Sequence, residues 1–197
     1  MKNDTTVLAI CRWLSLFAAA VVGLSVTGCA VSEQHDTSLL GPVARVLDDN
    51  QKAVLASWMA EHGNVRIATR EDCDCEDDIL YFQRVGPWGK PIPDYEPYAA
   101  VGDFNNDGQK DFAVVVVEAR RVKRSDGVLV IFNGPVSKSS NPAFVGKAQL
   151  FPHQALFASQ VEGYLLAGPF ESEACILRPK LDGYVEDCGG FVENGGK

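Results

Sequence analysis

Apolar residues recur at helical spacing between residues 50 and 62. Asp48 and Gln51 form a capping-box pattern before this segment, and Gly63 supplies a stop after it. We therefore expect an amphipathic helix over residues 50–62. Its apolar face would consist of Val54, Leu55, Trp58 and Met59.

After residue 64 the apolar residues come in short blocks separated by turn residues, a pattern that predicts strands. The four consecutive valines at 114–117 fit a strand buried on both faces. Residues 79–82 fit either a strand or a helical turn. One helix followed by closely spaced strands predicts an α+β fold, in which an N-terminal amphipathic helix packs on a mostly antiparallel β-sheet. The expected strands are 65–68, 98–104, 112–118, 128–132, 164–166 and two within 175–188.

Between two of these strands lies an acidic loop, residues 103–111, with oxygen-bearing side chains at its positions 1, 3, 5 and 9 and Gly108 at position 6. Three carboxylates so close together repel one another unless a cation lies among them. A flexible ring of about six to eight oxygens suits Ca²⁺, whereas Mg²⁺ demands a stricter octahedron. An Asx-type turn that binds no ion is the alternative. The predicted ligands are the side chains of Asp103, Asn105, Asp107 and Asp111 and the backbone carbonyl of Gln109.

The loop differs from an EF-hand, because its twelfth position is Val114 instead of glutamate and its flanks are predicted strands. The stretch 101–114 resembles the Asp-x-Asn-x-Asp-Gly-x-x-Asp loops of FG-GAP and VCBS repeats, which occur in integrin-type β-propellers and bacterial surface proteins. The acidic stretch 72–78 lacks the glycine and the spacing, so it is not a second copy. A propeller needs several blades. The resemblance therefore implies one calcium-stabilised hairpin and no propeller.

The amino terminus has the pattern of an export signal. Lys2 and Arg12 precede or flank an apolar run of 14 residues, Trp13 to Val26, which is too short to span a bilayer comfortably. The tetrad Val-Thr-Gly-Cys that ends at Cys29 resembles the lipobox of bacterial lipoproteins. The resemblance implies a signal peptide over residues 1–28 and a lipidated Cys29. The stretch that follows is polar without periodicity and predicts a flexible tether over 29–41, and the remaining length predicts a single domain over 42–197. Ala30 after the cysteine favours the outer membrane. The alternatives are a plain secretory signal or a buried apolar helix with a chance cysteine.

Without residues 1–28 the chain carries 16 basic and 25 acidic residues, a net charge of −9. This acidity argues against nucleic acid and anionic lipid as electrostatic partners. Four cysteines then remain beside Cys29, and an oxidising compartment favours disulfides. We expect Cys175 to bridge a hairpin to Cys188, and Cys73 to pair with Cys75. Bridges between the two pairs and a tetrathiolate zinc site are the alternatives.

No nucleophile–histidine pattern, phosphate-binding loop or dinucleotide motif occurs in the sequence, so we predict no catalytic residue. Our first hypothesis is a non-enzymatic, calcium-stabilised lipoprotein of the bacterial cell envelope, lipid-anchored in the outer membrane and facing the periplasm. It would bind another envelope protein or polymer, with an inhibitor or immunity protein as one subtype. The alternative is an envelope hydrolase that depends on a cation in the acidic loop.

Overall fold

The computed structural model describes residues 37–120, 126–149, 154–158, 163–169 and 174–188. Residues Gln34–Lys197 form one compact unit, and both hydrophobic cores of the protein lie within it. The predicted signal peptide, the lipidation site Cys29 and most of the basic stretch 120–124 lie outside the described residues. The helical elements are η1 (Thr37–Arg45), α1 (Asp49–Glu61), α2 (Arg70–Cys73), α3 (Glu76–Arg84) and η2 (Pro87–Gly89).

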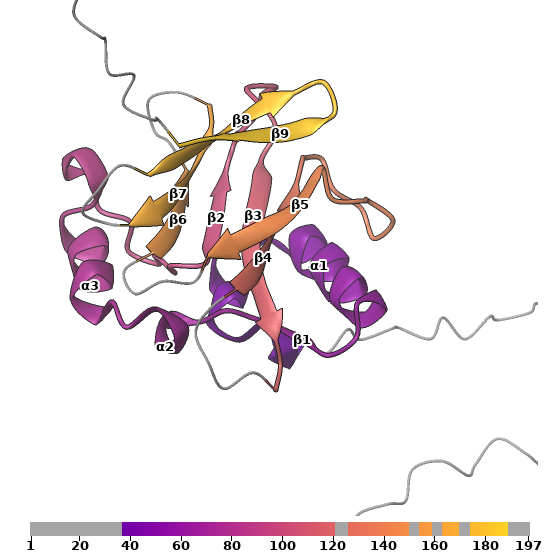
Figure 1. Cartoon of the computed structure of the whole chain (residues 1–197), viewed down its shortest axis with the longest axis horizontal. Coiled ribbons are helices and arrows are strands. Elements are labelled where there is room, and N and C mark those ends of the chain that lie inside the picture. Colours follow the sequence, from indigo (N-terminus) through magenta and orange to yellow (C-terminus); the bar gives the residue numbers. More distant parts are fainter. Residues whose placement is uncertain (1–36, 121–125, 150–153, 159–162, 170–173, 189–197) are drawn as a thin grey trace, which may run out of the picture. The chain divides into compact units, whose positions relative to one another are not determined.

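The strands form two antiparallel sheets, and the fold is α+β, as predicted (Figure 1). In the large sheet the order is β1-β3-β4-β5, and β2 pairs with β3 beside β1. In the small sheet the order is β6-β7-β8-β9. The strands of the large sheet are β1 (Val65–Ile67), β2 (Ala99–Gly102), β3 (Asp111–Glu118), β4 (Asp126–Phe132) and β5 (Phe144–Gln149). Those of the small sheet are β6 (Gln154–Ala158), β7 (Leu165–Pro169), β8 (Cys175–Lys180) and β9 (Gly183–Asp187).

Strand β3 is the centre of the molecule because its alternate side chains enter two different cores. Phe112, Val114 and Val116 pack with η1 and α1 on one face. Ala113, Val115 and Val117 pack with α3 and the small sheet on the other face. All four valines are buried, which confirms the prediction of a strand covered on both sides.

Helix α1 begins as the sequence predicts. The backbone N–H of Gln51 donates to Asp48 Oδ1 at 2.9 Å, and the N–H of Asp48 donates to Gln51 Oε1 at 3.0 Å. These two bonds satisfy backbone groups that have no partner within the helix. The predicted apolar face is buried and packs against the large sheet.

Several sequence predictions differ from the structure. The predicted tether to Gly41 ends too late, because η1 starts at Thr37 and Leu40 is only 1% exposed. For residues 79–82, where the sequence leaves a strand or a helical turn open, the structure shows helix, as part of α3. The acidic stretch 72–78 spans the end of α2 and the start of α3. There are two sheets where one was expected, since the face of β3 opposite α1 also needs a cover. Among the described helices, none combines the length and apolar character that crossing a membrane requires.

Candidate metal centre

The acidic loop connects β2 to β3 and is closed by the pairing of Gly102 with Asp111. Because β3 is fixed in both cores, the two ends of the loop are held in place by the centre of the fold. Asn106 has a φ of 60° and Gly108 a φ of 83°. These left-handed residues turn the chain tightly, and glycine adopts that conformation without steric cost. The sequence thus predicts both the hairpin and the need for a glycine at position 108.

Three of the predicted ligand side chains turn inward onto the backbone of the same loop. The carboxylate of Asp103 accepts the N–H of Asp107 at 3.0 Å and that of Gly108 at 2.8 Å. The same N–H of Asp107 also donates to Asn105 Oδ1 at 3.0 Å. Asp107 Oδ1 accepts the N–H of Gln109 at 2.8 Å, and Asp107 Oδ2 accepts from Asn105 Nδ2 at 2.9 Å. The structure therefore brings together the oxygens of Asp103, Asn105 and Asp107.

Asp111 lies at the base of the loop and is fully buried. Its Oδ2 accepts the N–H of Phe104 at 2.7 Å, and its Oδ1 accepts the N–H of Gly134 at 2.8 Å. Burial raises the pKa of Asp111, the backbone bonds from Gly134 and Phe104 oppose this rise, and the charge of Asp107 adds to it. The carboxylate form of Asp111 is thus costly in this protein unless positive charge is nearby.

Two residues that sequence reasoning missed complete the surroundings of the loop. At Gly134 a Cβ atom would lie 2.4 Å from the carbonyl oxygen of Lys110, so only glycine lets the β4–β5 connection approach the loop. Tyr184 of β9 is buried, and its hydroxyl donates to Asn133 Oδ1 at 2.7 Å. No signal in the local sequence marks either residue, because each meets the loop from a distant part of the chain.

The carboxylates of the acidic loop also affect the pKa of Tyr184. Burial raises its pKa first, and the charges of Asp111, Asp107 and Asp103 raise it further. All three carboxylates therefore disfavour ionisation of this one hydroxyl group. Among the described residues, no lysine or arginine forms an ion pair with any of the three.

The residues fit a calcium ion by their chemistry. Every predicted donor is an oxygen, which is the ligand type of a hard cation, and the local negative charge has no cationic partner among the described side chains. The Gln109 N–H contributes to the turn, while a role for its carbonyl stays a prediction. The three carboxylates are not part of a group whose ligand atoms all lie within 4.8 Å. In the structure each carboxylate is instead hydrogen-bonded to backbone amides.

Such a tight group does exist elsewhere, and it consists of Cys175, Glu186 and Cys188. The two cysteines are joined in a disulfide, so they offer no thiolate to a metal. Cys73 and Cys75 form the second disulfide. This is the pairing that the sequence favours over bridges between the pairs, and it leaves the four sulfur atoms out of any zinc site.

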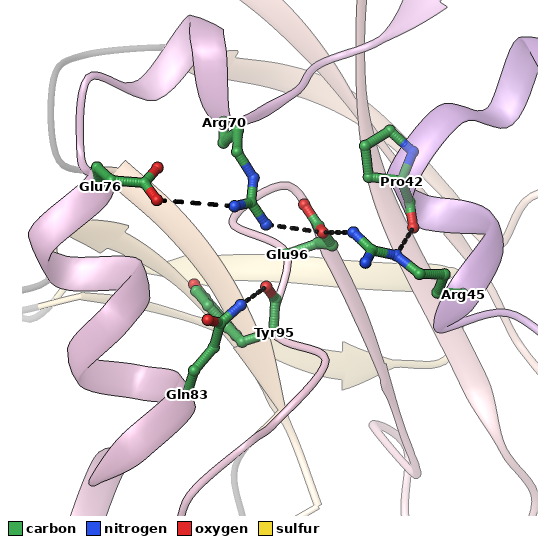
Figure 2. A network of polar contacts seen from close by, with 7 residues as sticks. All are labelled: Pro42, Arg45, Arg70, Glu76, Gln83, Tyr95 and Glu96. Atoms are coloured by element: carbon green, nitrogen blue, oxygen red, sulfur yellow. Dashed lines mark hydrogen bonds and ion pairs between the residues drawn. The ribbon is translucent and has the colours of Figure 1, made fainter.

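A second polar cluster surrounds Glu96, which is only 3% exposed (Figure 2). Its Oε1 accepts from Arg45 at 2.9 Å and from Arg70 at 3.0 Å, and Arg70 lies 3.8 Å from Glu76. The cluster ties η1, α2 and α3 to the segment before β2. Every charge in it is paired, so its arrangement is that of a structural contact rather than a reactive site.

No family model, no curated protein and no solved structure matches this chain.

Proposed function

We propose that the protein is a non-enzymatic, calcium-stabilised module of the bacterial cell envelope that binds another envelope protein or polymer. The observation that carries the proposal is the acidic loop. Asp103, Asn105 and Asp107 turn their oxygens onto one short turn, and the buried Asp111 closes its base. An ion there would offset the repulsion of three carboxylates and stabilise the β2–β3 hairpin at the centre of the fold.

A structural role for the ion follows from where the ligands come from. All of the proposed ligands belong to one loop, and Asp111 is buried at its base with both oxygens already hydrogen-bonded. A catalytic metal usually keeps an open position for water or substrate and has neighbouring acids or bases that handle protons. Beside the loop, Asn133 and Tyr184 hydrogen-bond to each other, and Lys180 and Asp182 line the neighbouring hollow from the β8–β9 turn. The structural role therefore rests on the origin of all the proposed ligands in one loop.

The proposed binding surface adjoins the loop. A surface hollow of about 620 Å³ lies between the acidic loop and the turn of the β8–β9 hairpin. Leu181 at that turn is fully exposed and offers an apolar contact beside the hollow. Asn105 and Asp107 line the same hollow as Leu181. Calcium would therefore fix one wall of the surface that the partner contacts.

Attachment to the membrane would come from diacylation of Cys29, as the lipobox-like tetrad at residues 26–29 implies. The acidic character of the chain gives it no electrostatic attraction to anionic lipid, so acyl chains would supply the binding. We propose the outer membrane, facing the periplasm, as its location. Mass spectrometry of the protein purified from a bacterial host would test this, because a Cys29→Ser variant should lose the mass of the acyl chains and retain its signal peptide.

Calorimetric titration of the unit Gln34–Lys197 with Ca²⁺ and with Mg²⁺ tests the metal site. We expect saturable binding of Ca²⁺ with a dissociation constant of about 10⁻⁴ to 10⁻³ M and weaker binding of Mg²⁺. The Asp107→Ala variant should lose the binding heat. If the loop were a catalytic centre instead, Asp107→Ala would abolish a hydrolytic activity on envelope polymers without lowering the stability that calcium confers.

Capture of envelope proteins on the same unit, with calcium and with chelator, then tests the binding role. A partner retained only by the wild-type unit in calcium supports it.

A further inference from the structure

A mostly apolar cavity of about 360 Å³, partly open to solvent, lies between the large sheet and the small sheet. Val115 and Leu129 line it from the large sheet, and Leu156 lines it from the small sheet. Protein interiors contain few voids larger than a water molecule. This cavity is more than twice the ~150 Å³ of an engineered apolar cavity that binds benzene. It has room for an aromatic ring or a short alkyl chain.

The cavity exists because small residues occupy the positions where the two sheets face each other. Ala148 of β5, Ala155 of β6 and Ala167 of β7 all line it. Leucine or phenylalanine at these positions would fill the space, as they do elsewhere in the same core at Leu165 and Phe104. The void is therefore a property of the side chains at one site and does not result from loose packing of the whole core.

Two charged residues line the cavity within the described part of the chain, Glu186 and Lys147. Glu186 pairs with the buried Leu177 and lies on the same face of β9 as the buried Tyr184, so its side chain is on the cavity side of the strand, and it is exposed at the mouth. A carboxylate oxygen of Glu186 lies within 4.8 Å of the sulfur atoms of Cys175 and Cys188, which also line the cavity. Among the described residues, no lysine or arginine forms an ion pair with Glu186.

Lys147 also borders the cavity, but its side chain belongs to the other face of its strand. It pairs with Val128 and adjoins Ala148, which packs toward the small sheet. Side chains alternate along a strand, so the ammonium group of Lys147 is directed away from the interior of the cavity. Of the described side chains, the one that places its charge on the cavity side of its strand is therefore the acidic Glu186.

We propose that this cavity binds a small amphipathic amine, with its apolar body between the two sheets and its ammonium group at Glu186. Apolar walls and one negative group at the mouth complement such a molecule, and the net charge of −8 attracts cations to the protein. A fatty acid of the same size would place its carboxylate against Glu186 and is disfavoured. The proposal is independent of the calcium site, because none of the predicted calcium ligands lines the cavity.

Three probes of equal length and different charge test the proposal by calorimetry on the unit Gln34–Lys197: octylamine, octanol and octanoate. Octylamine should bind most tightly, octanol should bind more weakly and octanoate should bind least. Glu186→Gln should weaken octylamine binding about fivefold, the size expected for an ion pair at a partly exposed site. It should leave octanol binding unchanged. Glu118→Gln, at an exposed site at the end of β3, is the matched control and should have no effect on either probe.

Variants that fill the cavity test its location. Ala167→Phe should abolish the binding of octylamine and octanol. If this variant fails to fold, the milder Ala155→Val takes its place, and it should weaken the binding of both probes. Circular dichroism and a melting curve establish that each variant is folded before titration. Equal affinity for the three probes would overturn the assignment of an amine. The absence of octylamine binding by the wild-type unit, or undiminished binding by a folded cavity-filling variant, would overturn the site itself. Repeating the titrations in calcium and in chelator should give the same affinities, so this result and the test of the calcium site are separate.

Discussion

Calcium should raise the stability of the wild-type unit and raise that of an Asp107→Asn variant much less. Asp107 is the central acid of the loop, and its side chain accepts the N–H of Gln109 and the side-chain amide of Asn105. Asparagine retains an acceptor oxygen of the same shape, so the turn can persist. It removes one of three negative charges whose mutual repulsion an ion would offset.

The size of the effect follows from binding linkage. An ion that binds only the folded state adds a stabilisation of RT ln(1 + [Ca²⁺]/Kd). With a dissociation constant of about 10⁻⁴ to 10⁻³ M, calcium at about 10 mM adds about 1.4 to 2.7 kcal/mol. A domain of this size shifts its Tm by about 2 to 4 °C per kcal/mol, so the wild-type shift should be about 3 to 11 °C.

The assay is a pair of melting curves for each variant, one with calcium and one with chelator at matched ionic strength. The variant itself costs about 0.5 to 1.5 kcal/mol because it disturbs the hydrogen bond from Asn105. The informative quantity is therefore the calcium-induced shift within each variant, not the difference in Tm between variants. Asp182→Asn is the control, since it removes the same charge at an exposed position beside the same hollow and should keep the full shift.

Two results would refute this reasoning. A wild-type Tm that is the same in calcium and in chelator would show that the loop is an acidic turn that binds no ion at this concentration. A full calcium shift in Asp107→Asn would show that the ion binds elsewhere, for example at the acidic surface around α2 and α3.

Three further outcomes follow from the structure. Arg66 contacts both carboxylate oxygens of Asp72 at 2.7 Å. Burial alone would raise the pKa of Asp72, but the hydrogen bonds from Arg66 and from the Thr69 N–H lower it below its usual value. The Asp72 carboxylate should contribute about 1 kcal/mol of stability at pH values above its pKa in the unfolded protein. This contribution should be lost as the pH falls through its pKa in the folded protein. The difference in unfolding free energy between wild type and Asp72→Asn should therefore shrink in acid. Gly134→Ala should destabilise the protein by about 1 to 3 kcal/mol and weaken calcium binding, because the added Cβ would overlap the Lys110 carbonyl. Denaturant unfolding measures the loss of stability, and calcium titration measures the loss of affinity. A variant unchanged in both would contradict the close approach of Gly134 to the loop. Glu96→Gln should lower the unfolding free energy by about 1 to 2 kcal/mol. This loss is smaller than for a fully buried ion pair, because Arg45 is 63% exposed. An unfolding midpoint equal to that of wild type would contradict the structural role of this cluster.

The sequence predicts those parts of the molecule that depend on neighbouring residues. The α1 cap joins residues three apart, so spacing alone predicts it, and the structure confirms it. The acidic-loop pattern is contained in nine consecutive residues, so spacing predicts its tight turn, while calcium binding stays a prediction. The doubly buried strand is evident from its run of valines. Strands β5 and β6 were not predicted, because Gly146, Lys147 and the alanines in these segments give no regular alternation of apolar and polar positions.

What the sequence does not reveal are contacts whose partners are far apart in the chain. Gly134 reaches Asp111 across 23 positions, Tyr184 reaches Asn133 across 51, and Arg45 reaches Glu96 across 51. Each contact helps to satisfy a buried or partly buried polar group, yet glycine, tyrosine and glutamate at these positions look ordinary in the local sequence. The two contacts beside the acidic loop have a mechanical consequence. Asp111 is bonded to Gly134, and the neighbouring Asn133 is bonded to Tyr184 of β9, so the loop is connected to the β8–β9 hairpin through side chains and backbone of the β4–β5 connection. An ion that stabilises the loop should therefore also slow hydrogen exchange at the amides of β9, whereas the amides of α1, on the opposite face of the large sheet, should exchange at an unchanged rate.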